Sequence, residues 1–180
     1  MLPEGITPPW ASTSINATSA LLVAIEPAPM RSYIFDFEAE KITKYPVVPK
    51  VAGSSGHYLS ECAMATLITK NHKKAYLQCL MRRFGHNYGI KALWAFDLDQ
   101  GELGEWIMEH FMNLEQHLST TAHSKVLVVY QGQLYSFDNV TKGSKIGSVF
   151  VNGSWQVLAT AFENATDSHP VFALPYFVRI

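Results

Sequence analysis

Three residues have types and spacing that could carry out nucleophilic chemistry: Cys62, His123 and Asp138. Cys62 follows the Gly/Ser-rich segment GSSG at residues 53–56, and Ser60 is a good N-cap residue just before it. These signals place Cys62 in the first turn of a predicted helix. Helix N-terminal amides and a nearby imidazolium both stabilise a thiolate and lower the pKa of a cysteine. The pattern therefore predicts an activated cysteine nucleophile.

His123 and Asp138 lie at the two ends of a predicted β-hairpin. Because the strands of a hairpin are antiparallel, a turn at Gly132 would bring Asp138 back towards His123. His123 would then act as the general base, and Asp138 would hold its imidazole in the useful tautomer. Asn139 is the alternative orienting residue.

The same residues also have ordinary structural explanations. Cysteine is among the residues most often buried, and Cys62 falls on the apolar stripe of its own predicted helix. Cys79 falls in the middle of the next predicted helix, where we expect it in the core. Since two cysteines cannot form the framework of a disulfide-rich fold, we expect free thiols and a reducing compartment. A single Cys62–Cys79 bridge is the alternative.

The order of these residues resembles the papain-like superfamily. It is closest in pattern to the compact cysteine proteases and glutamine deamidases that bacterial pathogens deliver into host cells. The matching residues are Cys62, the segment HSKVLVVY at 123–130 and FDN at 137–139. The resemblance implies a thiol-dependent amidohydrolase that cleaves a peptide or side-chain amide of a protein substrate without a cofactor. No Gln lies just upstream of Cys62, so His57, Ser55 or backbone amides of residues 53–56 would have to form the oxyanion hole.

A second hypothesis comes from a different class of protein. The chain could be a non-catalytic binding or inhibitor protein that uses its sheet or a basic helix face to contact a partner. The basic cluster that suggests such a face consists of Lys70, Lys73, Lys74, Arg82 and Arg83. The sequence leaves the substrate, the partner and the oligomeric state open.

Composition excludes several classes. The chain has 180 residues, of which 48% are hydrophobic and 16% charged, which is typical of one well-packed domain. A net charge of −1 without a basic stripe argues against a nucleic-acid partner. The apolar runs are too short for a membrane span, and the N-terminus has no Sec-type signal pattern. We therefore expect a cytoplasmic protein, or one delivered by a non-Sec secretion system.

The elements that must position the candidate residues follow from periodicity. Residues 1–19 predict a flexible leader, and residues 20–180 predict a single α+β domain of papain-like type, with central helices packed on a mostly antiparallel sheet. The predicted helices span about 60–68, 72–84 and 102–118. The predicted strands span 21–25, 31–38, 42–48, 89–96, 126–131, 133–137, 147–151, 154–162 and 171–179.

Two remaining patterns predict no further chemistry. His110 and His117 share a predicted helix face but stand about 10 Å apart, too far for one ion, so we expect no metal site. Four Asn-x-Ser/Thr patterns begin at Asn16, Asn139, Asn152 and Asn164. In the absence of a signal peptide, we interpret them as Ser/Thr-rich loops.

Overall fold

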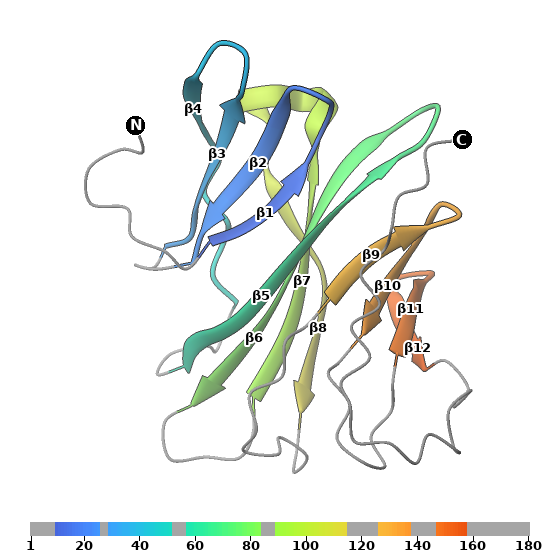
Figure 1. The fold of residues 1–180 in the computed structure, drawn as a ribbon. Coiled ribbons are helices and arrows are strands. Elements are labelled where there is room, and N and C mark those ends of the chain that lie inside the picture. The colour runs from blue at the N-terminus through green and yellow to red at the C-terminus, as the bar shows by residue number, and fades with distance from the viewer. Residues whose placement is uncertain are drawn as a thin grey trace, which may run out of the picture.

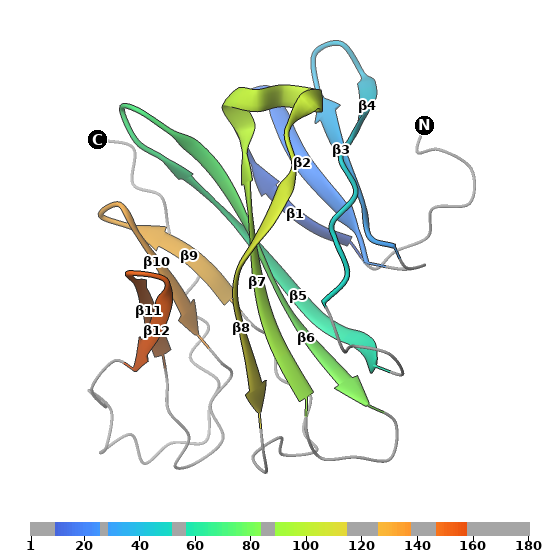
Figure 2. The same cartoon turned by 180° about the vertical axis from the view of Figure 1, so that it is seen from behind.

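The described residues form three antiparallel β-sheets of four strands each (Figure 1 and Figure 2). The computed structural model describes residues 10–25, 29–51, 57–83, 89–114, 126–137 and 147–157. Sheet A has the order β1-β2-β3-β4, sheet B the order β5-β6-β7-β8, and sheet C the order β12-β11-β10-β9. The strands are β1 (Trp10–Ser14), β2 (Ser19–Ala24), β3 (Arg31–Asp36), β4 (Lys41–Tyr45), β5 (His57–Ile68), β6 (Lys73–Arg83), β7 (Gly89–Asp97), β8 (Trp106–Leu114), β9 (Val126–Tyr130), β10 (Gln133–Phe137), β11 (Gly147–Val151) and β12 (Ser154–Val157).

Each sheet is a meander in which strands adjacent in the chain are also adjacent in space. Two of the tight turns have positive φ at both central residues, at Gln131-Gly132 and at Asn152-Gly153. This is the turn geometry that matches the twist of a two-residue hairpin, and Asn-Gly favours it. The predicted hairpin turns at Gly132 and Asn152-Gly153 are thus confirmed.

Sheet B lies between the other two sheets (Figure 1). One of its faces packs on sheet A, where Trp94 and Phe96 of β7 meet Leu21 of β2 in the larger core. Its opposite face packs on sheet C, where Leu93 meets Leu134 in a second core. Full burial of a side chain such as Phe96 contributes about 1.5–3 kcal/mol. The two cores therefore make sheet B the structural centre of the molecule.

Buried and partly buried hydrogen bonds connect sheet A to sheet B. The indole Nε1 of Trp106 on β8 donates to Oγ of Ser32 on β3 at 3.3 Å, and this hydroxyl donates to the carbonyl of Pro46 at 2.6 Å. Thr13 and Thr66 also share a hydroxyl–hydroxyl bond of 2.9 Å between β1 and β5. These bonds satisfy polar groups that the packing removes from water.

The predicted α+β class is wrong. The segments predicted as helices over 60–68, 72–84 and 102–118 form β5, β6, and the short 3-10 element η1 (Leu98–Leu103) followed by β8. The described residues contain no α-helix. Strands covered on both faces have no polar side, so their sequences do not alternate and resemble buried helices. In β6, for example, Tyr76 and Leu77 point to opposite faces and both are buried.

A β-bulge explains why β8 resembled the clearest amphipathic helix. The register shifts between Leu93 and Trp94, so that Trp94 pairs with Met108 while Leu93 pairs with His110. Glu109 is the additional residue on β8. A bulge shifts the alternation of side chains by one residue, so the face that even-numbered residues occupy on one side of it is occupied by odd-numbered residues on the other. Apolar residues therefore occur at both even and odd positions, which resembles the 3.6-residue period of a helix.

The predicted strands agree better with the structure. β10 and β11 occupy the predicted ranges 133–137 and 147–151, and β2, β3, β4, β7, β9 and β12 overlap their predicted ranges. β1 lies within the range 1–19 that we assigned to a leader, and the predicted strand at 171–179 lies outside the described residues. The described residues include no helix that is long and apolar enough to span a membrane.

Candidate functional site

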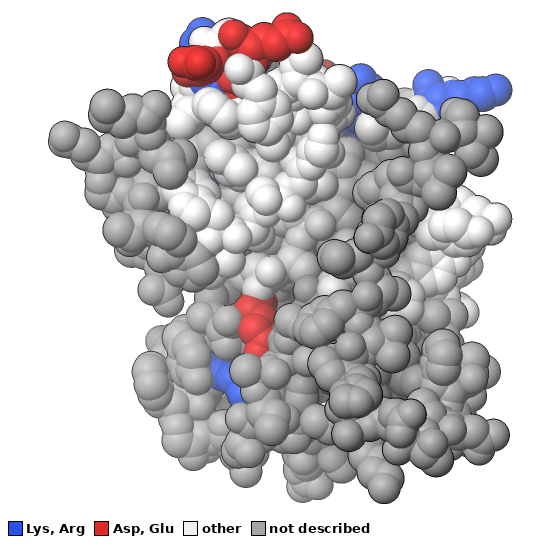
Figure 3. Space-filling view, in the orientation of Figure 1, with Lys and Arg blue, Asp and Glu red and all other residues white. Residues whose placement is uncertain are grey.

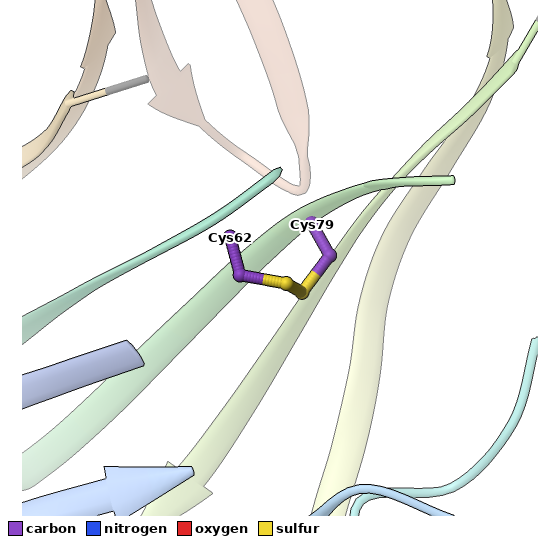
Figure 4. The surroundings of a disulfide bond; sticks show 2 residues. All are labelled: Cys62 and Cys79. Carbon is purple, nitrogen blue, oxygen red and sulfur yellow. A yellow bond between two sulfur atoms is a disulfide. The ribbon is translucent and has the colours of Figure 1, made fainter. Parts of the chain in front are cut away.

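Cys62 lies in the middle of β5, not at a helix N-terminus, and it pairs with Cys79 of β6. A disulfide joins the two sulfur atoms, as Figure 4 shows, and the two Cα atoms are 4.1 Å apart. Cys79 is fully buried in the core between sheets A and B. The expectation of free thiols is therefore wrong, because the structure contains the bridge that was the alternative. A sulfur in a disulfide is not a thiolate, so Cys62 cannot attack a substrate in this state.

The structure does not bring the predicted triad together within the described residues. His123, Asp138 and the alternative Asn139 lie outside them, as do residues 53–56, the predicted oxyanion loop. Their roles remain predictions. The basic face is also changed, because Lys73, Lys74 and Arg82 lie on strand β6 instead of a helix.

A buried polar cluster occupies the contact between sheets B and C. Nζ of Lys91 on β7 donates to Oγ of Ser136 on β10 at 3.2 Å, and Ser136 donates to Oε1 of Gln78 on β6 at 2.8 Å. The ammonium group of Lys91 also lies 5.2 Å from the ring centroid of Trp155. Both Lys91 and Ser136 are buried. The cluster therefore joins two strands of sheet B to two strands of sheet C.

A serine beside a lysine could in principle form a nucleophile and its base. Here the hydrogen bonds run the other way, since Lys91 donates to Ser136 and does not accept its proton. Ser136 is also only 1% exposed. A substrate could not reach this hydroxyl without separating the two sheets, so the cluster is structural.

The outer face of sheet C presents a row of aromatic side chains. Leu127 of β9 and Leu134 of β10 face sheet B. Because side chains alternate along a strand, the even-numbered residues of β9 and the odd-numbered residues of β10 face outward. Tyr135 and Phe137 are stacked on β10 with ring planes 12° apart and centroids 6.4 Å apart. The ring centroid of Tyr130 on β9 lies 6.4 Å from that of Tyr135. We call this surface the aromatic face, and its members are Val126, Val128, Tyr130, Gln133, Tyr135 and Phe137.

The aromatic face is exposed and uncharged. Tyr130 is 62% exposed, and Val126 and Phe137 are 39% and 37% exposed. Residues 126–137 and 147–157, the described part of sheet C, include no Lys, Arg, Asp or Glu. Charged side chains gather instead over the turns at the far end of sheets A and B, at the top of Figure 3. The polar groups within the aromatic face are amides and hydroxyls, such as the Tyr135 hydroxyl, which donates to Gln133 at 3.0 Å.

The chain has no match among family models, curated proteins or solved structures.

The sequence contained a signal for the aromatic face that the catalytic hypothesis did not use. In VLVVYQGQLYSF, residues 126–137, the apolar and aromatic residues alternate on two strands around a turn. Such a pattern predicts one face in the core and one face outside. The aromatic residues Tyr130, Tyr135 and Phe137 all fall on the outer face, and the segment has no charged residue, which indicates that the outer face is apolar as well.

Proposed function

We propose that this protein is a non-catalytic binding domain that captures a partner protein on the aromatic face of sheet C. The observation that carries the proposal is the row of exposed Tyr130, half-buried Tyr135 and exposed Phe137 on a sheet whose described residues include no charged side chain. Monomeric domains rarely leave contiguous apolar surface in water unless it is used for binding.

The composition of the face suits a protein interface. Interface centres are enriched in tyrosine and phenylalanine and depleted of lysine, glutamate and aspartate. Tyrosine offers a large contact area with only two side-chain torsions to fix, and its hydroxyl can find a hydrogen-bond partner. Aliphatic Val126 and Val128, the cross-strand partners of Phe137 and Tyr135, would complete a dry contact.

The face also has a firm support. Leu127 and Leu134 anchor its strands in the core with sheet B, and Ser136 links β10 to Lys91 and Gln78. A surface that is already ordered loses little conformational entropy when a partner binds. The arrangement therefore favours recognition by a preformed surface.

The amidohydrolase hypothesis has less support. Its nucleophile Cys62 is bound to Cys79. His123 and Asp138 lie outside the described residues, so the triad stays a prediction. Binding through the sheet requires only residues within 126–137, which the structure describes.

Photo-crosslinking at the aromatic face tests the proposal. A benzoylphenylalanine would replace Tyr130, and a second variant would carry it at Phe111, an exposed aromatic position on β8. In the cells that make the protein, position 130 is expected to crosslink one partner protein that position 111 does not. The proposal would be overturned if both positions gave the same crosslinked products. It would also be overturned if position 130 crosslinked only to a second copy of the chain or to a glycan.

Affinity measurements with the purified partner complete the test. Tyr130→Ala and Tyr135→Ala are each expected to weaken binding by about tenfold or more, since a truncated hot-spot residue costs more than about 1.4 kcal/mol. Phe111→Ala is the matched control and should change the affinity less than about twofold. Equal affinities for all variants would show that the aromatic face does not contact the partner.

A further inference from the structure

Two sequons occupy exposed hairpin turns at opposite parts of the fold. Asn16-Ala17-Thr18 lies between β1 and β2 of sheet A, and Asn152-Gly153-Ser154 lies between β11 and β12 of sheet C. Both asparagines are exposed. The other two sequons, at Asn139 and Asn164, lie outside the described residues.

The side-chain amide of Asn16 is oriented by its own sequon. Its Oδ1 accepts hydrogen bonds from the backbone N–H of Thr18 at 2.8 Å and from the Thr18 hydroxyl at 3.2 Å. These bonds use the carbonyl end of the carboxamide. Among the described residues nothing bonds to Nδ2, so a substituent on this nitrogen would extend into solvent without displacing a packed group.

Asn152 is similarly placed. It is the first central residue of its turn, with φ of 50°, and the following Gly153 also has positive φ. The Ser154 hydroxyl donates to the carbonyl of Val151 at 3.2 Å. A group attached to Asn152 would leave the end of sheet C and would not enter the core shared with sheet B.

The disulfide supplies an independent observation that points to the same compartment. Disulfides form and persist where the surroundings are oxidising, and they are rare where glutathione keeps thiols reduced. Cys62–Cys79 joins two strands at the centre of the fold. The secretory route is where oxidation and transfer of oligosaccharides to Asn-x-Ser/Thr occur together.

We propose that Asn16 and Asn152 carry N-linked oligosaccharides and that the chain folds in an oxidising secretory compartment, in place of the reducing compartment and the unmodified loops expected from the sequence. The donor is an oligosaccharide on a lipid pyrophosphate. A bond forms between Nδ2 of the asparagine and the anomeric carbon, while the bond from that carbon to the pyrophosphate oxygen breaks. The lipid pyrophosphate leaves with the electron pair, and Nδ2 loses one proton.

Peptide mapping of the protein isolated from the cells that make it tests the proposal. Peptide N-glycosidase in H₂¹⁸O converts a glycosylated asparagine to ¹⁸O-labelled aspartate. Label is expected at positions 16 and 152, and the intact mass should fall to that of the bare chain with ¹⁸O-labelled aspartate in place of those two asparagines. A mass that already equals the bare chain, or label confined to Asn139 and Asn164, would overturn the proposal.

Sequon variants provide the matched controls. Thr18→Ala and Ser154→Ala retain the asparagines but remove the hydroxyls that the transferase requires, so each should abolish label at its own site. Thr18→Ser should retain label at Asn16, which excludes a folding defect as the cause of the loss. Asn71→Gln changes an exposed asparagine outside any sequon and should leave both labels in place. Label at Asn16 that survives Thr18→Ala would contradict transfer by this route.

Discussion

Cys62 on β5 lies directly opposite Cys79 on β6, and a disulfide joins their side chains across the antiparallel pair. The bond joins two strands of the central sheet, and the two cysteines are 17 residues apart in the chain. It changes the interpretation of Cys62 from an activated nucleophile to part of the structural framework.

The disulfide predicts that the protein contains no reactive thiol. Without reductant, iodoacetamide is expected to modify neither cysteine, even in guanidinium chloride, and mass spectrometry after reduction should show two modified sites. Rapid modification of Cys62 near neutral pH that slows in His123→Ala would contradict this prediction and would support the catalytic triad instead.

The same bond should contribute to stability. Cys62→Ala/Cys79→Ala is expected to lower the free energy of unfolding by about 2–4 kcal/mol, because the bond closes a loop between residues 17 apart and its loss returns conformational freedom to the unfolded chain. Urea denaturation of the variant and of the parent protein, with and without reductant, measures the difference. Reductant should destabilise the parent protein but not the variant.

Ser136 should matter more for stability than its size suggests. Ser136→Ala removes a hydrogen bond with Lys91 and another with Gln78 inside the contact between sheets B and C. Loss of buried partners of this kind costs about 1–3 kcal/mol. The exposed Ser12→Ala is the control, expected to stay within about 0.5 kcal/mol by urea denaturation. Equal effects of the two substitutions would show that the cluster does not hold the sheets together.

A pair of leucines tests whether sheet C is packed on sheet B. Leu134 is 3% exposed in the second core, whereas Leu103 in η1 is 97% exposed. Leu134→Ala is expected to cost about 2–5 kcal/mol because it leaves a cavity. Leu103→Ala should change the unfolding free energy by less than about 0.5 kcal/mol. If Leu134→Ala proved as mild as Leu103→Ala, the packing of sheet C would be refuted.

The raised pKa of Tyr76 predicts that the protein loses stability at high pH. Burial, and secondly the nearby carboxylate of Glu109, raise the pKa of the Tyr76 hydroxyl above its ordinary value of 10.0. The unfolded chain then releases this proton at lower pH than the folded chain. The contribution to stability is complete below pH 10.0 and is lost as the pH rises towards the folded pKa.

Denaturation as a function of pH measures this effect. The unfolding free energy should decline above pH 10.0, and Tyr76→Phe should make that decline less steep. Tyr45, whose pKa is raised by burial and secondly by Glu102, should behave in the same direction. A Tyr76→Phe protein with an unchanged slope would contradict the assignment.

The sequence predicts the outer sheets better than the central one. In β10 and β11, one face contacts sheet B and the other meets solvent, so period-two patterns and turn residues locate these strands. β6 has no such contrast, because Leu77 packs towards sheet A and Tyr76 towards sheet C. Without a polar face, local sequence cannot distinguish a buried strand from a helix.

The site illustrates the same limit. The spacing of Cys62, His123 and Asp138 suggested a triad only because Cys62 was assigned to a helix start. Once that segment is a strand, the register with β6 places Cys79 opposite, a relation that depends on pairing between segments. The aromatic face, in contrast, depends on alternation within residues 126–137 and could have been predicted.

The order of the sheets along the chain has a consequence for synthesis on the ribosome. Sheet A is made first and can cover one side of sheet B as it emerges, but the side that carries Leu93 and Ala95 waits for sheet C. Until residues beyond 125 leave the exit tunnel, the nascent chain exposes this apolar side, a surface prone to aggregation. A chaperone that holds nascent chains would find its binding surface there, and translation that stalls before β9 would leave an insoluble fragment.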